Sequence, residues 1–353
     1  MTGKLPLIVL GGTGYVAGEL LRLIAGHPQV ELRAVLSDSQ PGEPIAKWFP
    51  HLAPVYPTLS FSPLDEVKQL VATLPQSAIL SAAPHGVAAQ LIDQLLATAE
   101  AHGRTPRVID ISADYRYASA DAYEAVYKHA HGAPQRIAQF TRALPEHFEG
   151  VPAGHVAHPG CFSTAVLLPC VPILKLGLVE PRLFVVGVTG STGSGRTPAA
   201  GTHHPQRHGD FYAYSALAHR HAPEIAAIAQ AASGVAAELN FVPHSGPYAR
   251  GIHVTVQAVA RRALGTAGLL EALREFYRGK PFVRVSEGMP HVKDVAASNY
   301  AVLSGTTNGR TVALTCVVDN LVKGAAGGAM QWLNRLYGFE ERAGLTAPAA
   351  GWT

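Results

Sequence analysis

The chain has 353 residues, of which 48% are hydrophobic and 15% charged, and its formal net charge is +3. This balance excludes a disordered chain, and the lack of a dense Lys/Arg cluster argues against a nucleic-acid partner while permitting an anionic substrate. Three cysteines are too few for a disulfide framework, which favours a reducing cytoplasm. We find no signal-peptide pattern and no apolar run long enough for a bilayer, so we expect a cytoplasmic protein of two domains without a membrane partner.

The N-terminal residues carry the pattern of a dinucleotide-binding turn. An apolar strand at Leu5–Leu10 leads into the glycine-rich segment Gly11–Gly18, and a helix is expected to begin near Glu19. In this context Gly11 allows a tight turn, and Gly14 lets the backbone approach a pyrophosphate at the helix N-terminus. The alternative is an ordinary tight connection between a strand and a helix.

Polar residues follow the second predicted strand, Glu31–Leu36. An acidic residue at this position usually binds the ribose 2′-hydroxyl of NAD, whereas NADP sites tend to offer arginine. Asp38 therefore favours NAD, while the hydroxyls of Ser37 and Ser39 suit a 2′-phosphate. The alternative for Asp38 is a turn residue that caps a loop.

The alternation of strands and helices continues beyond residue 100. Strands are predicted at Ala78–Ala83 and Val108–Ser112, with a helix at Val87–Ala101 between them. This pattern predicts a parallel, doubly wound sheet. Arg116 lies just beyond the last of these strands, where such sheets bind ligands. His85 either lines a nicotinamide pocket or, in the commoner role of an isolated loop histidine, bonds to backbone.

Cys161 is the strongest candidate for a nucleophile. A short strand-like run ends in a Pro-Gly break at 159–160, and an apolar run, Ala165–Leu168, reads as the first turns of a helix. This order places Cys161 at a helix N-terminus, where unpaired N–H groups and the helix dipole favour the thiolate, which is the nucleophilic form. The alternative is a buried structural cysteine.

A segment in the middle of the chain combines glycines, histidines and arginines. The loop Gly190–Arg196 is either an anion-binding nest or a flexible connector. Two roles compete for the histidines. A zinc site would draw on His203, His208 and either His219 or His221, but their spacing matches no standard ligand pattern, so we predict no metal. The other role is acid/base catalysis by one histidine beside the cysteine, with arginines for an anionic substrate.

The second half of the chain favours strands over helices. Further strands are predicted at Leu183–Thr189, Asn240–His244, Arg250–Val256 and Val312–Val318. Few helices separate them, so we expect a mainly antiparallel sheet. A run of small residues then leads into a C-terminal helix at Met330–Leu336, and Asn320 before it has the alternative role of a helix N-cap.

Seven short motifs stand out along the chain: GGTGY at 11–15, DISADYR at 110–116, HPGC at 158–161, GSGR at 193–196, HRHAPEI at 219–225, RGI at 250–252 and DNLVKG at 319–324. With these motifs the chain resembles, from about Leu5 to Phe339, the N-acetyl-γ-glutamyl-phosphate reductases of arginine biosynthesis, relatives of aspartate-semialdehyde dehydrogenase. The resemblance implies an NAD(P)-dependent oxidoreductase that reduces an acyl phosphate to a semialdehyde through a cysteine thioester.

The resemblance also implies an α/β fold of two domains. Residues 1–157 form a Rossmann-type doubly wound parallel sheet, completed by the C-terminal segment 320–353. Residues 158–319 form an α+β catalytic and dimerisation domain around the mainly antiparallel sheet. A homodimer or homotetramer is expected.

Residue roles follow from the same motifs. Cys161 is implied as the acyl-accepting nucleophile and His219 as the acid/base. The residues implied around the cofactor are Gly11, Thr13, Gly14, Tyr15, Val16, Ser37, Ser39 and Asn320. The candidates for binding the phosphate or carboxylate of the substrate are Arg116, Arg196, Arg220 and Arg250, whose guanidinium groups match such anions bidentately.

Two choices stay open at this point. The resemblance implies NADP, but Asp38 stands where many family members carry arginine, which leaves NAD as an alternative. The segment Thr202–Arg207 is similar to a lysine-pathway branch that reduces α-aminoadipyl phosphate on an acidic carrier protein, whereas Phe241–His244 is similar to the arginine branch. Outside this class, the alternatives are a nucleotide-sensing module without catalysis and a cysteine hydrolase.

Overall fold

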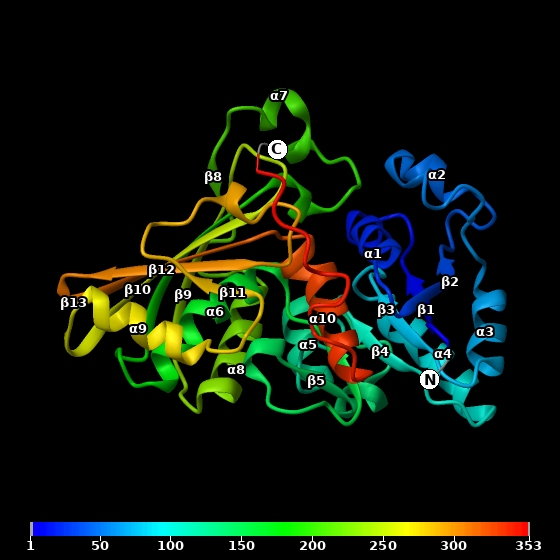
Figure 1. Ribbon diagram of the computed structural model, residues 1–353, viewed down its shortest axis with the longest axis horizontal. Helices are drawn as coiled ribbons and strands as arrows, with labels where there is room; N and C mark the ends of the chain where they lie inside the picture. Colours follow the sequence, from blue (N-terminus) through cyan, green and yellow to red (C-terminus); the bar gives the residue numbers. More distant parts are fainter. Residues whose placement is uncertain (1–2, 352–353) are drawn as a thin grey trace. The chain divides into compact units, whose positions relative to one another are not determined.

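The computed structural model describes residues 3–351 and divides the chain into two compact units (Figure 1). The first unit contains the chain up to Arg142 together with Gly150–His158 and Ala326–Leu345. The second unit contains Ala143–Glu149, Pro159–Ala325 and the residues from Thr346 onward. The first unit is therefore completed by a shorter C-terminal segment than the expected 320–353.

Specific contacts explain where these boundaries fall. Leu144 is fully buried in the core of the second unit, and the neighbouring Glu146 pairs there with Lys323. Asn320 accepts a hydrogen bond from the Gly251 N–H of the same unit. Near the C-terminus, the Ala350 N–H donates to the Ala296 carbonyl. These contacts hold both ends of the predicted C-terminal segment in the second unit.

The first unit is built on six parallel strands in the order β2-β1-β3-β4-β6-β5. Their bounds are β1 Leu5–Leu10, β2 Val30–Leu36, β3 Ala78–Ser81, β4 Arg107–Asp110, β5 Phe140–Arg142 and β6 His155–Ala157. This arrangement confirms the predicted doubly wound parallel sheet.

Helices cover both faces of this sheet. Helix α3 (Leu64–Thr73) packs beside α4 (Ala88–Ala101) over a core that includes Ile8 and Leu10, while the alternate β1 residues, also buried, face the opposite side. Helix α1 (Tyr15–Ala25) packs beside α10 (Gly327–Leu336). The shorter helices of this unit are α2 Ile45–Trp48 and α5 Ala120–Tyr127, with 3₁₀ turns at Pro50–Leu52 and Pro134–Gln139.

Two predicted helix starts in this unit are placed too late. Helix α1 begins at Tyr15 rather than near Glu19, because Gly14 is extended (φ −79°, ψ 164°) and Tyr15–Gly18 form the first turn. Helix α10 begins at Gly327 rather than Met330, directly after a π-helical turn at Val322–Ala326. Both starts lie in glycine-rich segments, which carry no clear periodic apolar signal.

The second unit is built on seven strands in the order β11-β12-β13-β10-β7-β9-β8. Their bounds are β7 Arg182–Thr189, β8 Tyr212–Ala213, β9 Glu238–Ser245, β10 Ile252–Leu264, β11 Val283–Val285, β12 Ala301–Thr307 and β13 Gly309–Val318. The neighbours are antiparallel except for β11 with β12 and β7 with β9. The expectation of a mainly antiparallel sheet is confirmed.

One face of this sheet is covered by helices, and the other is open over β7 and part of β10 but covered at Val302 and Val317. Helix α6 (Cys161–Lys175) packs on β10 and β13, with α8 (His221–Ser233) beside it and α9 (Thr266–Phe276) on β12 (Figure 1). On the opposite face Phe184 and Val186 of β7 and Val259 of β10 are exposed. The remaining short elements are α7 His204–Arg207 and 3₁₀ turns at Pro145–His147, Ser191–Ser194, Ala200–Thr202 and Val292–Asp294.

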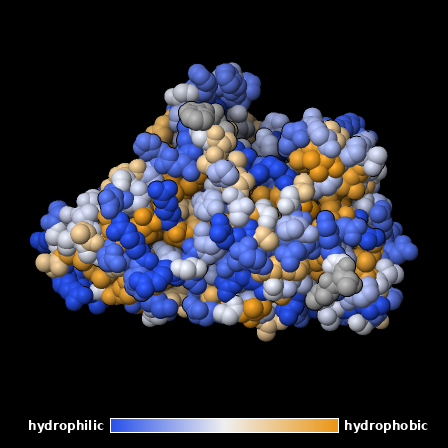
Figure 2. Space-filling view, viewed as in Figure 1, coloured by the Kyte–Doolittle hydropathy of each residue, from blue (hydrophilic) through white to orange (hydrophobic). Residues whose placement is uncertain are grey.

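The visible surface is mostly hydrophilic, with separate apolar patches (Figure 2). None of the helices within residues 3–351 is both long and apolar enough to cross a bilayer.

Candidate active site

Cys161 is the first residue of α6, as the Pro-Gly break predicts. Gly160 is its N-cap, in an extended conformation (φ −60°, ψ 161°) and without a side chain to cap the helix. The side chain of Cys161 is partly exposed, whereas Cys170 and Cys316 are buried, and burial raises the pKa of both of these thiols. Cys161 is thus the cysteine placed for chemistry, since the helix N-terminus favours its thiolate and the others are held as thiols.

Glu224 fixes the start of this helix from a distance of 64 residues along the chain. Its Oε1 accepts a hydrogen bond of 2.7 Å from the Gly160 N–H. The carboxylate is fully buried and comes from the first turn of α8. The bond therefore ties the cap of the cysteine helix to a second helix, and no local pattern in the sequence signals it.

Cys161 and His219 line one cavity of about 550 Å³, so the structure brings the two predicted catalytic residues together. The other lining residues are Phe162, Thr189, Gly193, Ser194, Tyr212, Tyr214, Ser215, Ala218, Arg220, His221 and Ser245. The glycine-rich loop predicted as either a nest or a connector thus forms part of the wall, through Gly193 and Ser194.

His219 is held neutral with one defined tautomer. Burial, followed by the positive charge of Arg220, lowers its pKa to about 4. Its Nδ1 accepts a hydrogen bond of 3.2 Å from the His221 N–H, which assigns the ring proton to Nε2. Edge-to-face contacts with Phe162 and Phe241 fix the ring plane. At neutral pH this histidine is a hydrogen-bond donor at Nε2.

Tyr214 is a cavity residue that the sequence analysis missed. Burial, followed by the negative charge of the Cys161 thiolate, raises its pKa, so its hydroxyl stays protonated. Its ring lies 5.6 Å from that of His219. Its sequence context, directly after the short strand Tyr212–Ala213, carries no signal of this role.

A π-helical turn forms the backbone wall beside the cysteine. A Cβ on Gly324 would lie 2.8 Å from the Cys161 Cβ, so only glycine fits there. The turn is anchored by Lys323, whose Nζ lies 2.5 Å from Glu146 Oε1 and 5.6 Å from the centre of the Phe282 ring. Both charged side chains are fully buried. Single π-turns inside helices are frequent at functional sites.

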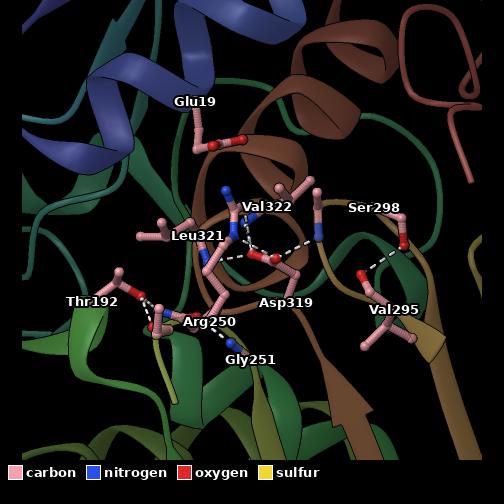
Figure 3. A network of polar contacts seen from close by, with 12 residues as sticks. Glu19, Thr192, Arg250, Gly251, Val295, Ser298, Asp319, Leu321 and Val322 are labelled. Carbon is pink, nitrogen blue, oxygen red and sulfur yellow. Dashed lines mark hydrogen bonds and ion pairs between the residues drawn. The ribbon is translucent and has the colours of Figure 1, made fainter. Parts of the chain in front are cut away.

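Asp319 caps this turn and organises the polar contacts around it (Figure 3). Its Oδ1 accepts hydrogen bonds from the Leu321 and Val322 N–H groups at 2.8 and 2.9 Å. Its carboxylate also pairs with Arg250 at 3.0 and 3.2 Å. The cap is therefore Asp319, and the alternative of an N-cap at Asn320 is wrong.

Asn320 instead joins two loops of the second unit. Its Oδ1 accepts from the Gly251 N–H at 2.7 Å, and its Nδ2 donates to Thr192 Oγ1 at 3.0 Å (Figure 3). The side chain is 2% exposed. Its role near a nicotinamide stays a prediction.

The four predicted arginines have different surroundings. Arg220 lines the Cys161 cavity. Arg250 is paired with Asp319, and Arg196 is partly exposed at the end of the glycine-rich loop. Arg116 is buried in the first unit, where it donates to the carbonyls of Ile111 and His158 at 2.6 and 2.9 Å. Substrate binding by these residues stays a prediction.

The glycine-rich turn of the first unit fits a dinucleotide pyrophosphate. Gly11 has φ +81°, and a Cβ on it would lie 2.4 Å from the Ala82 carbonyl oxygen. A Cβ on Gly14 would meet no atom within 4 Å, so space is open in front of the first turn of α1. The N–H groups of Tyr15 and Val16 lie in that turn, and Thr13 precedes it. This is the backbone arrangement that binds phosphate at a helix start.

The residues after β2 offer both chemistries that the sequence analysis left open. Ser37 is buried, and its Oγ lies 3.4 Å from Ser39 Oγ. Asp38 is exposed between them. His85 follows β3, and its Nδ1 accepts a 2.9 Å hydrogen bond from the Ala113 N–H, which is the backbone role weighed for it.

The histidines around residue 200 are divided between two cavities. His221 lies in the Cys161 cavity, and His204 and His208 line another. Within residues 3–351 no group of three or more His, Cys, Asp or Glu side chains is placed to hold a metal ion.

Comparison with known proteins matches both units. A family model described as semialdehyde dehydrogenase, NAD binding domain, matches residues 7–148, and one described as semialdehyde dehydrogenase, dimerisation domain, matches residues 161–320. The chain is 39% identical to the N-acetyl-gamma-glutamyl-phosphate reductase of Nitrosococcus oceani, over 96% of each chain. It is 38% identical to that of Ectopseudomonas mendocina, over 97% of this chain and 98% of the relative.

This chain belongs to the N-acetyl-γ-glutamyl-phosphate reductase family. The match to the semialdehyde dehydrogenase dimerisation domain begins at Cys161, the first residue of α6. The fold extends to more distant proteins: aspartate semialdehyde dehydrogenase II of Vibrio cholerae superposes with a TM-score of 0.69 at 15% identity, over 95% of this chain and 99% of the other.

The relatives distinguish the two branches that the sequence left open. The similar proteins from Nitrosococcus oceani, Ectopseudomonas mendocina and Brevibacillus brevis all bear the name of the arginine-branch reductase. The lysine-branch alternative suggested by Thr202–Arg207 is therefore not favoured within this reductase family.

Proposed function

We propose that this chain reduces N-acetyl-γ-glutamyl phosphate to N-acetylglutamate 5-semialdehyde and phosphate, using a nicotinamide cofactor in the cytoplasm. The observation that carries the proposal is the cavity shared by Cys161, at the start of α6, and a neutral His219 with its proton at Nε2. Family membership indicates the substrate class, and the residues of the cavity indicate the reaction mechanism.

Cys161 acts first in this scheme. Its thiolate attacks the carbonyl carbon of the acyl phosphate, the bond from that carbon to the phosphate oxygen breaks, and phosphate leaves. A thioester on Cys161 remains. When bound, the reduced nicotinamide cofactor supplies a hydride to the thioester carbon.

His219 completes the reaction by stabilising negative charge. Its Nε2–H donates a hydrogen bond to the alkoxide oxygen that forms when hydride adds to the thioester carbon, and collapse of this alkoxide re-forms the carbonyl, breaks the carbon–sulfur bond, and frees the semialdehyde and the Cys161 thiolate. Arg220, in the same cavity, is a candidate for the phosphate or carboxylate of the substrate. Glu224 holds Gly160, so that Cys161 stays at the helix start while its sulfur is acylated and released.

The cofactor assignment is NADP, with NAD as the alternative. The turn at Gly11–Gly14 serves either cofactor, because it contacts only the shared pyrophosphate. Ser37 and Ser39 offer hydroxyls to a 2′-phosphate, whereas the exposed Asp38 carboxylate would accept from a free 2′-hydroxyl. Measured dissociation constants for NADP and NAD would show whether the serine hydroxyls or the Asp38 carboxylate determine cofactor preference.

The open face of the second sheet supports assembly into a homodimer or homotetramer. Phe184, Val186 and Val259 are 52%, 44% and 44% exposed on neighbouring strands. Burying these side chains against a second copy would stabilise the pair through the hydrophobic effect. Sedimentation of the wild-type protein and of Phe184→Lys tests this face, and a monomeric variant is the expected result.

A steady-state assay tests the reaction itself. The chain is expected to oxidise free N-acetylglutamate semialdehyde in the presence of phosphate and cofactor. It is expected to be inactive on α-aminoadipate semialdehyde attached to an acidic carrier protein. Mass spectrometry of quenched turnover should find the acyl adduct on Cys161. Turnover without an adduct at this residue would contradict the thioester mechanism. A preference for the carrier-linked substrate would indicate the lysine-pathway reaction instead.

A further inference from the structure

We propose that a second cavity in the second unit is a binding pocket for one small oxyanion, a phosphate or carboxylate group, with Arg207 as its main ligand. The cavity measures about 270 Å³ and shares no lining residue with the cavity of Cys161. Its polar lining residues are Ser191, Thr202, His204, Arg207, His208 and Tyr248. The proposal concerns binding alone and does not depend on the reaction proposed above.

Arg207 carries the argument because its positive charge is buried without a counter-charge. It is the last residue of α7 and is 7% exposed, although the residues around it in the chain are mostly exposed. One guanidinium nitrogen, Nη2, donates to the Gly246 carbonyl. The other, Nη1, is buried and has no partner within the described part of the chain. A buried donor on a charged group is costly unless it is satisfied, so an anion in the cavity would stabilise this side chain.

The other walls add hydrogen-bond donors. His204 and His208 lie one helical turn apart, with ring centres separated by 5.1 Å, and both rings are accessible from the cavity. None of the residues that line the cavity is Asp or Glu. The side chain of Tyr248 is held in place at the edge of the cavity, because its hydroxyl donates to the Val188 carbonyl at 3.0 Å. The surface over α7 is hydrophilic (Figure 2). A pocket that contains one buried guanidinium with an unpartnered nitrogen, further donors and no carboxylate therefore fits an anion.

The size of the cavity restricts the ligand. Pockets for drug-sized molecules and cofactors usually span roughly 300–1,000 Å³. A volume of about 270 Å³ falls just below that range and suits an ionic group better than a nucleotide. A guanidinium together with imidazole and hydroxyl donors matches the oxygens of phosphate or carboxylate equally well. Free phosphate and a carboxylate are therefore the two sources that the experiment must separate.

Calorimetric titration of the full chain with inorganic phosphate, and separately with acetate, tests the pocket. The wild-type protein is expected to bind one of these ions, and Arg207→Gln is expected to weaken that binding by about tenfold or more, since a charge-assisted pair is lost. Arg262→Gln is the matched control, because Arg262 is exposed on β10 and should leave the titration unchanged. Stronger binding of phosphate than of acetate would identify free phosphate as the source, and the reverse would identify a carboxylate.

Arg220→Gln separates this pocket from the catalytic cavity, which holds Arg220. Binding that survives Arg220→Gln and is weakened by Arg207→Gln supports the proposal. Binding that is unchanged in Arg207→Gln, binding that is lost only in Arg220→Gln, or no binding of either ion by the wild-type protein would overturn it. Should Arg207→Gln unfold, His204→Ala/His208→Ala takes its place, because both histidines are exposed. Unchanged phosphate and acetate binding in that double variant would overturn the proposal as well.

Discussion

The two helices α1 and α6 start in the same way but expose different chemistry. Each follows a strand of the parallel sheet, and each is capped by an extended glycine, Gly14 or Gly160, without a side-chain cap. In front of Gly14 there is open space. At Gly160 the N–H is occupied by Glu224, and Gly324 packs against the next residue, Cys161. The first turn of α1 thus has open space in front of its cap, whereas at the start of α6 the protein's own groups occupy the cap and pack against the cysteine.

Replacing the sulfur should have the largest effect, because it removes the chemistry of the α6 start and leaves the α1 start intact. For Cys161→Ser we expect kcat to fall by on the order of 10⁴-fold or more, with cofactor affinity unchanged. Stopped-flow assays give the rate, and cofactor fluorescence gives the affinity. Cys170→Ala, nine residues along the same helix, should retain the activity. Cofactor binding that falls together with the rate would contradict the separation of the two helix starts.

Removing the hydrogen-bond donor His219 from the Cys161 cavity comes next. For His219→Asn we expect kcat to drop by about 10²–10⁴-fold, whereas His51→Asn, at an exposed position, should have no effect. The pH profile gives an independent check. Burial lowers the pKa of His219 to about 4, so the ring is neutral above about pH 5 and becomes cationic only as the pH falls through 4. A wild-type rate that changes with a histidine pKa near its ordinary value of 6.5 would count against this role.

Removing the buried charge that anchors the π-turn beside Cys161 should lower the free energy of unfolding. Lys323→Met leaves the buried carboxylate of Glu146 without its partner, and such a loss typically costs about 3–5 kcal/mol. Denaturant unfolding measures this loss. Lys47→Met is the matched control, because it removes the exposed pair with Glu43, for which we expect less than about 1 kcal/mol. Equal losses in the two variants would show that the buried pair does not anchor the π-turn.

Adding a methyl group at Gly14, where space is open in front of α1, should have the smallest effect on activity and stability. In Gly14→Ala the added methyl meets no protein atom within 4 Å and the backbone keeps φ −79°, so stability should be unchanged. Cofactor affinity should fall by about tenfold, because the methyl stands where the pyrophosphate approaches. Gly11→Ala is the contrast: with φ +81° and a contact of 2.4 Å it should destabilise the fold itself. An unchanged cofactor affinity in Gly14→Ala would contradict binding of the pyrophosphate at this turn.

The sequence predicted that a helix follows each of these two glycines, because each arrangement is encoded by a few consecutive residues, although it placed the start of α1 near Glu19 instead of at Tyr15. A strand, a glycine turn and a helix are local features, and so are the Pro-Gly break and the cysteine after it. The contacts that close the α6 start could not be predicted in the same way. Glu224 reaches Gly160 across 64 positions and Lys323 reaches Glu146 across 177, so no window of sequence contains both partners. The pairing of Arg250 with Asp319, 69 positions away, is likewise beyond any local pattern, and substrate binding by this motif arginine stays a prediction.

The π-turn at Val322–Ala326 makes the helix that follows it unusually sensitive to length. A π-turn contains one residue more than an α-turn, so deleting a single amino acid there would let the backbone rewind as a regular α-helix. Each residue advances such a helix by about 100°, and the segment upstream of the deletion would rotate by that amount. Gly324 would then be carried away from Cys161, while Trp332 and Asn334 downstream kept their buried positions. The position of the Gly324 backbone beside Cys161 therefore depends on the one extra residue of the π-turn.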